Sequence, residues 1–250
     1  MKKEKVHVYA PATVANVVCG FDVLGFAVDA PGDEIIITRN NSGKINFECD
    51  LLNGTKGLTT QPEKNAAGNS ILHYVKTMGL KDGLDIRLLK KMPVGSGMGS
   101  SAASAAAAVF AVNTLYGNLL TREELIPFAM EGERAACGSA HADNVAPSLL
   151  GGIVLIRSYE PFECRCLPVP QALYCVLVHP HFKVSTRKAR AAIENKIPLT
   201  KAVKQWGNVG ALVAGFYEED VELIGRSMCD EVAEPARTKF IPGFYEMKSA

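Results

Sequence analysis

The chain consists of stretches in which apolar residues alternate with polar ones or form short runs, and stretches in which they recur every three to four positions. The first pattern is typical of strands and the second of helices that face a core on one side. The first pattern predicts strands over residues 5–10, 33–39, 44–49, 85–90, 152–157 and 174–179. The second predicts helices over residues 65–78, 100–116 and 123–137, a helix that begins near residue 185, and another over 222–230. The mixture predicts an α+β protein.

Local signals mark several boundaries in this pattern. Pro11 follows the first strand directly, and because proline cannot donate to a strand ladder we expect the strand to end there. Thr121-Arg-Glu-Glu124 predicts a capping box at the start of a helix. The segment 161–170 contains three prolines and two cysteines and is typical of a crossing between domains. We therefore expect one domain over residues 1–165 and a second over residues 166–250.

The charge, apolar content and cysteines of the chain limit the partners and the cellular location that we expect. The 250 residues carry a formal net charge of +1, which gives no reason to expect nucleic acid or an anionic membrane as partner. No secretory signal follows the N-terminal lysines, and no apolar run approaches the roughly 20 residues of a spanning helix. The seven cysteines are scattered, and Cys164-x-Cys166 lacks the common zinc spacing. Reduced thiols and a cytoplasmic location are therefore expected.

The sequence Pro-Val-Gly-Ser-Gly-Met-Gly-Ser-Ser over residues 93–101 joins a predicted strand to a predicted helix. Its alternating glycines let the backbone approach a ligand closely, and the N–H groups at a helix start attract anions. Ser100 and Ser101 could bond phosphate oxygens or a phosphate-bound Mg²⁺. The spacing is neither that of a Walker A loop nor that of the dinucleotide fingerprint. A phosphate cradle and a flexible turn capped by serines both remain open.

Glu133 is a carboxylate on an otherwise apolar helix face, which it shares with Leu125, Ala129 and Ala136. Burying a charge costs several kcal/mol, of order 3–5, unless the charge is paired or bound to a metal. The residue is therefore either at the rim of the core, paired with a basic residue, or an Mg²⁺ ligand that faces the serines of the glycine-rich sequence.

Asn16 and Asp22 lie among small and apolar residues, where such side chains either bond their own backbone or face a ligand. His141, Asp143 and Asn144 occupy four consecutive positions. They lack the nucleophile elbow of a hydrolase and are too few for a metal site on their own, so a polar turn is the simple alternative. An amide such as Asn144 cannot take up a proton at neutral pH.

Five strings resemble motifs of one family. Residues 93–103, Pro-x-x-x-Gly-Met-Gly-Ser-Ser-Ala-Ala, are similar to the phosphate-binding motif of the GHMP small-molecule kinases. Residues 11–25, 141–152 and 185–190 are similar to patterns of the homoserine kinases within that family, and Glu-Pro-x-Arg over 234–237 is a further match. The resemblance implies a two-lobed GHMP kinase fold, with an N-terminal lobe like ribosomal protein S5 domain 2 and a ferredoxin-like C-terminal lobe.

The resemblance also implies an activity and roles for residues. The activity is transfer of the γ-phosphoryl group of ATP, with Mg²⁺, to the hydroxyl of L-homoserine, as in threonine biosynthesis, and the enzyme is often a homodimer. Ser101 and Glu133 would hold the metal and, with Asn144, form the catalytic group. Nucleotide contacts are implied for Asn65, for which a helix cap is the alternative, and for Pro93, Val94, Gly95, Ser96, Gly97, Met98, Gly99, Ser100 and Ser101. Substrate contacts are implied for Asn16, Asp22, His141, Asn144, Thr186, Arg190 and Arg237.

One departure stands against this pattern. The family's third, glycine-rich motif is absent, so we expect either a sequence cut short in its second lobe or an inactive relative that only binds nucleotide. A mevalonate or sugar kinase of the same family is the other alternative. It would need an aspartate where Asn144 stands, and it would not need the pair Arg190 and Arg237, which fits an amino-acid carboxylate.

Overall fold

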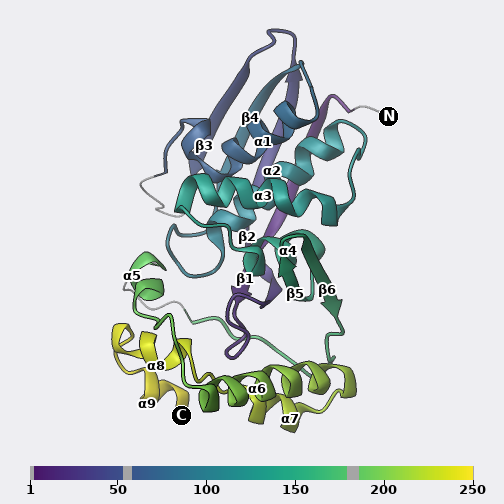
Figure 1. Cartoon of the computed structure of the whole chain (residues 1–250). Helices are drawn as coiled ribbons and strands as arrows, with labels where there is room; N and C mark the ends of the chain where they lie inside the picture. Colours follow the sequence, from purple (N-terminus) through teal and green to yellow (C-terminus); the bar gives the residue numbers. More distant parts are fainter. Residues whose placement is uncertain (1–2, 53–57, 179–185, 250) are drawn as a thin grey trace.

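The structure, a computed structural model, describes residues 3–52, 58–178 and 186–249. Its upper lobe in Figure 1 contains one six-stranded sheet in the order β3-β4-β2-β5-β6, with β1 paired to β2. Strand β2 is the spine of the sheet: it pairs along most of its length with β1, at one end with β5 and at the other with β4. The strands are β1 (Lys5–Ala15), β2 (Leu24–Asn40), β3 (Ile45–Leu51), β4 (Gly83–Lys90), β5 (Ile153–Tyr159) and β6 (Phe162–Leu167).

Four helices pack together against this sheet (Figure 1): α1 (Ala66–Thr77), α2 (Ser100–Leu115), α3 (Arg122–Cys137) and α4 (Ala142–Leu150). A short 3₁₀ turn, Pro62–Lys64, precedes α1. Helix α2 is central and rich in buried alanines, which let it lie close to the sheet and to its neighbouring helices. This close packing fixes the start of α2, where the glycine-rich sequence ends.

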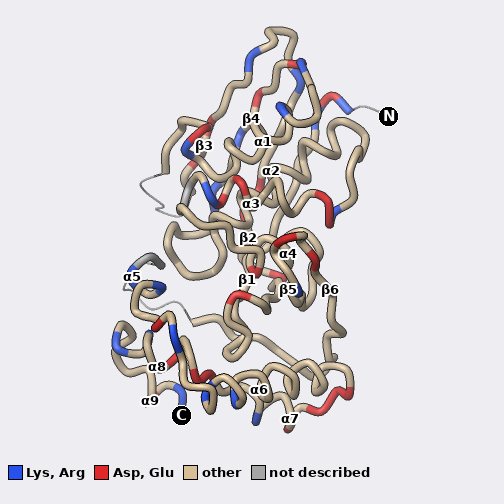
Figure 2. Tube along the Cα trace, viewed as in Figure 1, with Lys and Arg blue, Asp and Glu red and all other residues tan. Residues whose placement is uncertain are grey.

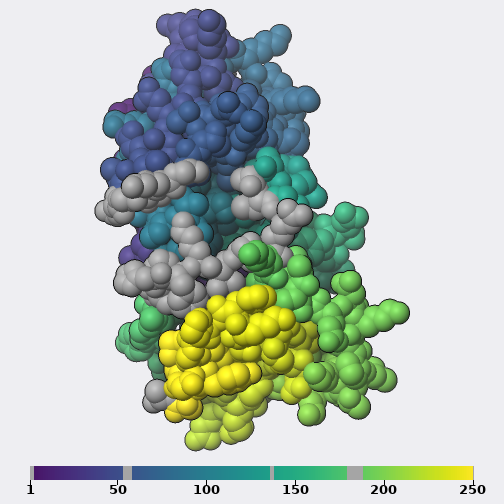
Figure 3. All heavy atoms as spheres, turned by 90° about the vertical axis from the view of Figure 1, so that its left-hand side faces the viewer, coloured from purple at the N-terminus to yellow at the C-terminus, as the bar shows by residue number. Residues whose placement is uncertain are grey.

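The lower lobe consists of α5 (Thr186–Ala191), α6 (Leu199–Glu218), α7 (Val221–Ser227), α8 (Ala233–Arg237), a 3₁₀ turn (Thr238–Phe240) and α9 (Phe244–Ser249). Figure 3 shows the C-terminal helices, in yellow, below the sheet lobe. A second apolar cluster joins α6 and α7 to β5, β6 and the loop between β1 and β2; it includes Leu212, Phe216, Ile224, Cys19 and Leu24. The side chain of Gln205 on α6 also donates to the backbone carbonyl of Cys19. The loop that carries Asp22 is therefore supported from below.

The expected two-lobed α+β fold is confirmed by this architecture, but several boundaries differ. The prediction that the first strand ends at Pro11 is wrong, because β1 continues to Ala15. Its register with β2 shifts between Pro11 and Thr13, and proline is tolerated at such an irregularity, where the ladder is already interrupted. The segment expected to cross between domains contains β6, which forms a hairpin with β5.

The strand predicted over residues 174–179 is also wrong over its described part, which has no regular structure up to residue 178; His179 lies outside the described residues. Tyr174 and Val176 are 92% and 84% exposed. Alternating apolar residues favour a strand only where a neighbouring strand accepts their hydrogen bonds, and no described strand pairs with this segment. The proposed boundary near residue 165 stays a proposal.

Charges are mixed over both lobes. Figure 2 shows Lys and Arg interspersed with Asp and Glu along the trace, in keeping with the near-zero net charge. Among the described residues no helix has the length and apolar character needed to cross a membrane.

Candidate active site

The glycine-rich loop, residues 91–99, connects β4 to α2. Gly95, Gly97 and Gly99 have φ values of +73°, +78° and +63°, a region that other residues rarely adopt. Gly99 is the N-cap of α2, so the unpaired N–H groups of the first helical turn lie at the end of the loop. The loop thus joins an exposed, left-handed backbone to the positive end of a helix dipole, which suits a phosphate group.

A buried ion pair lies beneath this loop. The ammonium of Lys90, at the end of β4, donates to the carboxylate of Asp33 on β2, to the carbonyl of Ser100 at 2.6 Å and to the hydroxyl of Ser104 at 2.9 Å. The other carboxylate oxygen of Asp33 accepts from the backbone N–H groups of residues 91 and 92, at 2.9 and 3.0 Å. The network therefore ties both ends of the loop to the sheet.

This ion pair was missed from the sequence, although a signal was present. Ile86, Leu88 and Lys90 share one face of the strand by the period of two, so a lysine stands where the pattern requires an apolar residue. A buried lysine needs an acidic partner. The pattern alone does not identify that partner as Asp33, which is 57 residues away.

Glu133 on α3 faces the start of α2. It is 4% exposed, and the hydroxyl of Ser101 donates a hydrogen bond to its carboxylate. Burial raises the pKa of Glu133, while the Ser101 hydrogen bond and the nearby Lys90 ammonium favour the charged form. Its Oε1 atom has no hydrogen-bond partner among the described residues. A buried carboxylate oxygen with no donor, beside a hydroxyl and a phosphate-type loop, fits a divalent cation.

Asn144, in the first turn of α4, lies against the end of the glycine-rich loop. The Thr13 hydroxyl on β1 donates to Asn144 Oδ1 at 2.9 Å. A Cβ atom added at Gly99 would lie 2.1 Å from Thr13 Oγ1 and 2.8 Å from Asn144 Oδ1. Only glycine therefore fits there, and the amide lies next to the phosphate-type loop. Thr13 was missed by the sequence analysis, because nothing in its spacing distinguishes it from other strand threonines.

Near the start of α4, whose N-cap is His141, charged residues from three distant segments meet. Arg190 on α5 contacts both carboxylate oxygens of Asp22 at 2.7 Å, and its Nη2 is 3.5 Å from His141 Nδ1. Burial and then Arg190 lower the pKa of His141. The guanidinium groups of Arg190 and Arg237 lie 5.3 and 4.9 Å from the ring centroid of Phe21.

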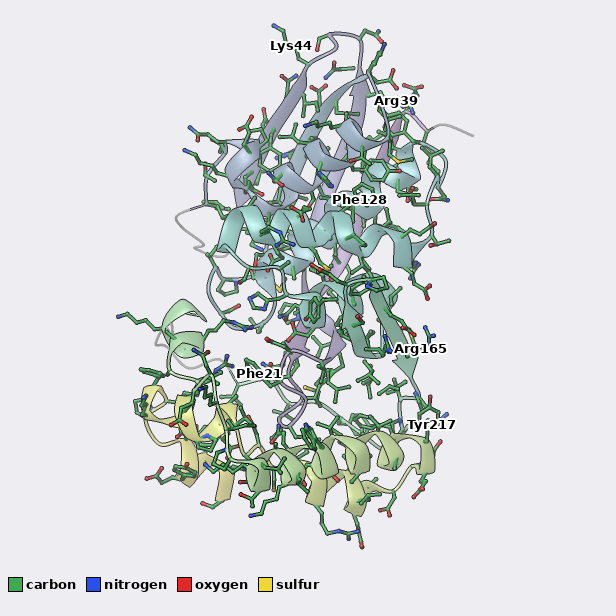
Figure 4. All side chains as sticks on the ribbon, viewed as in Figure 1. Phe21, Arg39, Lys44, Phe128, Arg165 and Tyr217 are labelled. Atoms are coloured by element: carbon green, nitrogen blue, oxygen red, sulfur yellow. The ribbon has the colours of Figure 1, made fainter. Side chains whose placement is uncertain are left out.

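Phe21 was also missed by the sequence analysis. It lies between the sheet lobe and the lower helices (Figure 4), and its ring holds the two arginines near one another through cation–π contacts. Asp22, His141, Arg190 and Arg237 thus lie close together, and their contacts with a substrate stay a prediction. Arg190 is already paired with the Asp22 carboxylate, so a ligand carboxylate would share this arginine with Asp22.

Asp143 also contributes to the charge of this cluster. Burial, and then repulsion from Asp22, raise its pKa to about 7, and its Oδ1 atom has no hydrogen-bond partner among the described residues. Ligand atoms of Asp22, His141 and Asp143 lie within 4.8 Å of one another. Since Arg190 already neutralises Asp22, this cluster suits an uncharged or zwitterionic ligand better than a second metal.

Three predicted contacts behave differently. Asn16 Oδ1 accepts from the backbone N–H of Asp22 at 3.1 Å, so the alternative of a backbone-bonding loop holds for that atom. Asn65 caps α1 by accepting from Ala67 N at 3.0 Å and donates to the Thr59 carbonyl at 3.0 Å, so the cap is observed and the adenine contact stays a prediction. Thr186 begins α5, but its side chain lies outside the described residues.

The class of protein that this fold and site define is a small-molecule kinase: residues 65–152 match the family described as GHMP kinases N terminal domain. Homoserine kinase from Chlorobium phaeobacteroides (strain BS1) is 49% identical over 97% of this chain and 78% of that protein. Homoserine kinase from Xylella fastidiosa (strain M12) is 37% identical over 97% of this chain and 74% of that protein. On these relatives, the chain belongs to the homoserine kinase family.

Solved structures agree. A crystal structure of homoserine kinase from Cytophaga hutchinsonii has a TM-score of 0.95 at 53% identity, covering 100% of this chain and 79% of that one. Mevalonate kinase from L. major in complex with R-mevalonate has a TM-score of 0.67 at 18% identity, covering 91% of this chain and 76% of that one. This second likeness supports the fold alone.

Proposed function

We propose that the protein transfers the γ-phosphoryl group of ATP to the hydroxyl of L-homoserine, giving O-phospho-L-homoserine and ADP. The single observation that carries this proposal is the junction at Asn144. Its amide adjoins the phosphate-type loop at Gly99, and the helical turn that carries it also carries Asp143, part of a charged cluster that contains two arginines and two carboxylates. One side suits the phosphates of a nucleotide, and the other suits the ammonium and carboxylate of an amino acid.

Mg²⁺ fits the buried side of the loop. Ser101 and Glu133 would hold it, because the Glu133 Oε1 atom is buried without a donor and Ser101 already contacts that carboxylate. When bound, the ion would neutralise charge on the β- and γ-phosphates. The N–H groups at the start of α2 and the hydroxyl of Ser100, which is buried with no partner among the described residues, would contribute donors to the same phosphates.

The amino acid would lie over Phe21. Arg237, together with Arg190, would bind its carboxylate through paired N–H donors, while Asp22 would attract its ammonium group. His141 and Asn16 border this space, and His141 would be neutral because burial and Arg190 lower its pKa. This arrangement would direct the side-chain hydroxyl of homoserine toward Asn144 and the glycine-rich loop.

Transfer then requires orientation more than a base. The hydroxyl oxygen forms a bond to the γ-phosphorus, the bond from that phosphorus to the bridging oxygen of ADP breaks, and the hydroxyl proton leaves to water or to the transferred phosphate. Asn144 cannot accept this proton. Phosphoryl transfer depends mainly on positioning and charge stabilisation. The glycine-rich loop, the metal ligands and the two arginines would supply both.

The test is ADP release with Mg·ATP and a panel of L-homoserine, L-threonine, mevalonate and galactose. We expect turnover with homoserine alone. Turnover with mevalonate or galactose instead would contradict the substrate. A nucleotide-dependent rise in the thermal midpoint with no turnover for any substrate would favour a binding-only protein.

Variants of α3 test the metal ligand. Glu133→Gln should lower kcat by roughly 10²–10³-fold, because the variant loses the negative charge that would hold Mg²⁺ in the transition state. Glu131→Gln is the matched control, because the Glu131 side chain is partly exposed on the same helix and pairs with Arg134 one turn away; its kcat should stay at the wild-type value. Asn144→Ala should lower kcat less than Glu133→Ala does. The reverse order would contradict catalysis by orientation.

The remaining parts of the proposal follow from the family. We propose a nucleotide-binding domain over residues 1–165 and a second domain over residues 166–250, a cytoplasmic location and a homodimer. Size-exclusion chromatography with light scattering tests the last of these, for which a monomer at micromolar concentration would be the contrary result.

A further inference from the structure

We propose that Thr13 is a positioning residue for the reaction: its hydroxyl fixes the side-chain amide of Asn144 so that the amide NH₂ donates to the acceptor hydroxyl oxygen. The inference rests on the proposed function and adds a residue and an orientation to it. It starts from the hydrogen bond in which Thr13 Oγ1 donates to Asn144 Oδ1 at 2.9 Å, across 131 residues of sequence.

The surroundings of Thr13 hold this hydrogen bond in place. Thr13 is fully buried, and its backbone N–H donates to the Met98 carbonyl at 3.1 Å, so the strand is attached to the glycine-rich loop itself. The register shift of β1 between Pro11 and Thr13 turns this part of the strand relative to the residues before it. Both side chains fill the space that a Cβ atom at Gly99 would need, 2.1 Å from Thr13 Oγ1 and 2.8 Å from Asn144 Oδ1, so they pack directly against the loop.

The direction of the hydrogen bond decides what Asn144 can do. An amide has one oxygen that accepts and one NH₂ group that donates. Because Oδ1 is held by the Thr13 hydroxyl, the amide is fixed in one of its two flipped orientations, and its NH₂ is the group that can donate to a ligand. A donor there can bond one lone pair of the substrate hydroxyl and leave another to attack the γ-phosphorus, which restricts the reacting geometry without any proton transfer to the protein.

A residue that acts through another predicts coupled kinetics. Thr13→Val keeps the shape and removes the hydroxyl, so we expect kcat to fall about tenfold, the order of one lost hydrogen bond. The KM values for Mg·ATP and homoserine should change less than kcat. Thr13→Ser keeps the hydroxyl, so it should retain most of the wild-type kcat. Thr38→Val, at a strand threonine of β2 on the far part of the sheet, is the matched control and should leave kcat unchanged.

The double variant separates positioning from general stability. Thr13→Val combined with Asn144→Ala should be no slower than Asn144→Ala alone, since Thr13 has nothing left to orient. Additive losses, or a wild-type kcat for Thr13→Val, would overturn the inference. Thermal midpoints of all variants are measured alongside, so that a fall in the folded fraction is not read as a fall in kcat.

A readout that does not depend on turnover completes the test. The side-chain amide signals of Asn144 in a ¹⁵N–¹H spectrum are assigned by their loss in Asn144→Ala. We expect them to shift in Thr13→Val and to stay near the wild-type position in Thr13→Ser. Unshifted signals in Thr13→Val would overturn the inference even if the wild-type protein showed no homoserine turnover, a result that would by itself contradict only the proposed function.

Discussion

Replacing Lys90 by methionine tests the energetics of the loop support directly. The Lys90 and Asp33 side chains are 2% and 0% exposed, and methionine keeps most of the buried volume of lysine while it removes the ammonium. Asp33 then keeps two backbone donors and the Ser104 hydroxyl, at 2.9 Å, but loses its only charged partner among the described residues. Breaking a buried pair by removing one partner costs about 3–5 kcal/mol.

For a chain of this size, each kcal/mol lowers the thermal midpoint by about 2–4 °C, so Lys90→Met should lower it by roughly 6–20 °C. Lys91→Met is the matched control: it is the next residue, also a lysine paired with a carboxylate of β2, but its side chain is 38% exposed. An exposed pair of this kind contributes about 0–1 kcal/mol. Midpoints from urea and thermal unfolding, followed by circular dichroism, compare the two variants.

The double variant Lys90→Met with Asp33→Asn isolates the unpaired charge. Asparagine keeps an oxygen for the N–H groups of residues 91 and 92 and carries no charge, so the double variant should regain a large part of the lost stability. If Lys90→Met and Lys91→Met had equal midpoints, or if the double variant were no more stable than Lys90→Met, the buried-pair reasoning would be refuted.

Three further predictions concern the loop and the charged cluster. Gly99→Ala should lower kcat at least about tenfold, because its methyl would lie 2.1 Å from Thr13 Oγ1, whereas Gly43→Ala, also at positive φ but with no atom within 4 Å, should not change kcat. Asp143→Asn should flatten the pH dependence of the urea midpoint. The folded-state pKa of about 7 lies above the ordinary 3.8, so the folded protein holds the extra proton, and the stability present below pH 4 is lost as pH rises to 7, by about 1.4 kcal/mol per pH unit. An equally steep dependence in the variant would contradict this. Arg190→Lys should raise the KM for homoserine about tenfold or more and leave that for Mg·ATP unchanged, since a lysine cannot make paired contacts to a carboxylate; a rise for Mg·ATP alone would count against the assignment.

Features set by neighbouring residues were predictable from the sequence. The capping box before α3 forms as its residues indicate: Thr121 Oγ1 accepts from the Glu124 N–H at 3.3 Å, and Glu124 Oε2 accepts from the Thr121 N–H at 2.8 Å. All atoms of this motif lie within one helical turn. Most strands and helices of the sheet lobe were predicted for the same reason. The strand prediction for residues 174–178 was wrong because a strand needs a neighbouring strand, and the residues of the segment do not show whether one is present.

The site shows the same division between local and distant information. The sequence indicated which residue types gather, through the glycine spacing and the carboxylate on an apolar helix face. It could not indicate which partners each would choose. Asp22 and Arg190 are 168 residues apart in the sequence. The sequence analysis expected Arg190 to bind a substrate carboxylate and did not predict its pairing with Asp22. Phe21, which contacts both arginines, was missed because its side chain has no polar atom that would suggest a role in the site.

Three of the buried polar atoms that lack a partner among the described residues belong to the glycine-rich loop's surroundings and the charged cluster. Glu133 Oε1, Asp143 Oδ1 and the Ser100 hydroxyl are buried without partners among the described residues, and each such group costs about 1–3 kcal/mol. They belong to three helices, α3, α4 and α2, which pack against one another in the apolar core of the upper lobe. Buried polar groups in folded proteins normally have partners, so unpaired groups at the start of α2, at the start of α4 and near the end of α3 suit a ligand that supplies the missing partners. Glu133 lacks a cation, Asp143 a donor and Ser100 an acceptor. A metal–nucleotide complex beside an amino acid would supply groups of all three kinds at that junction.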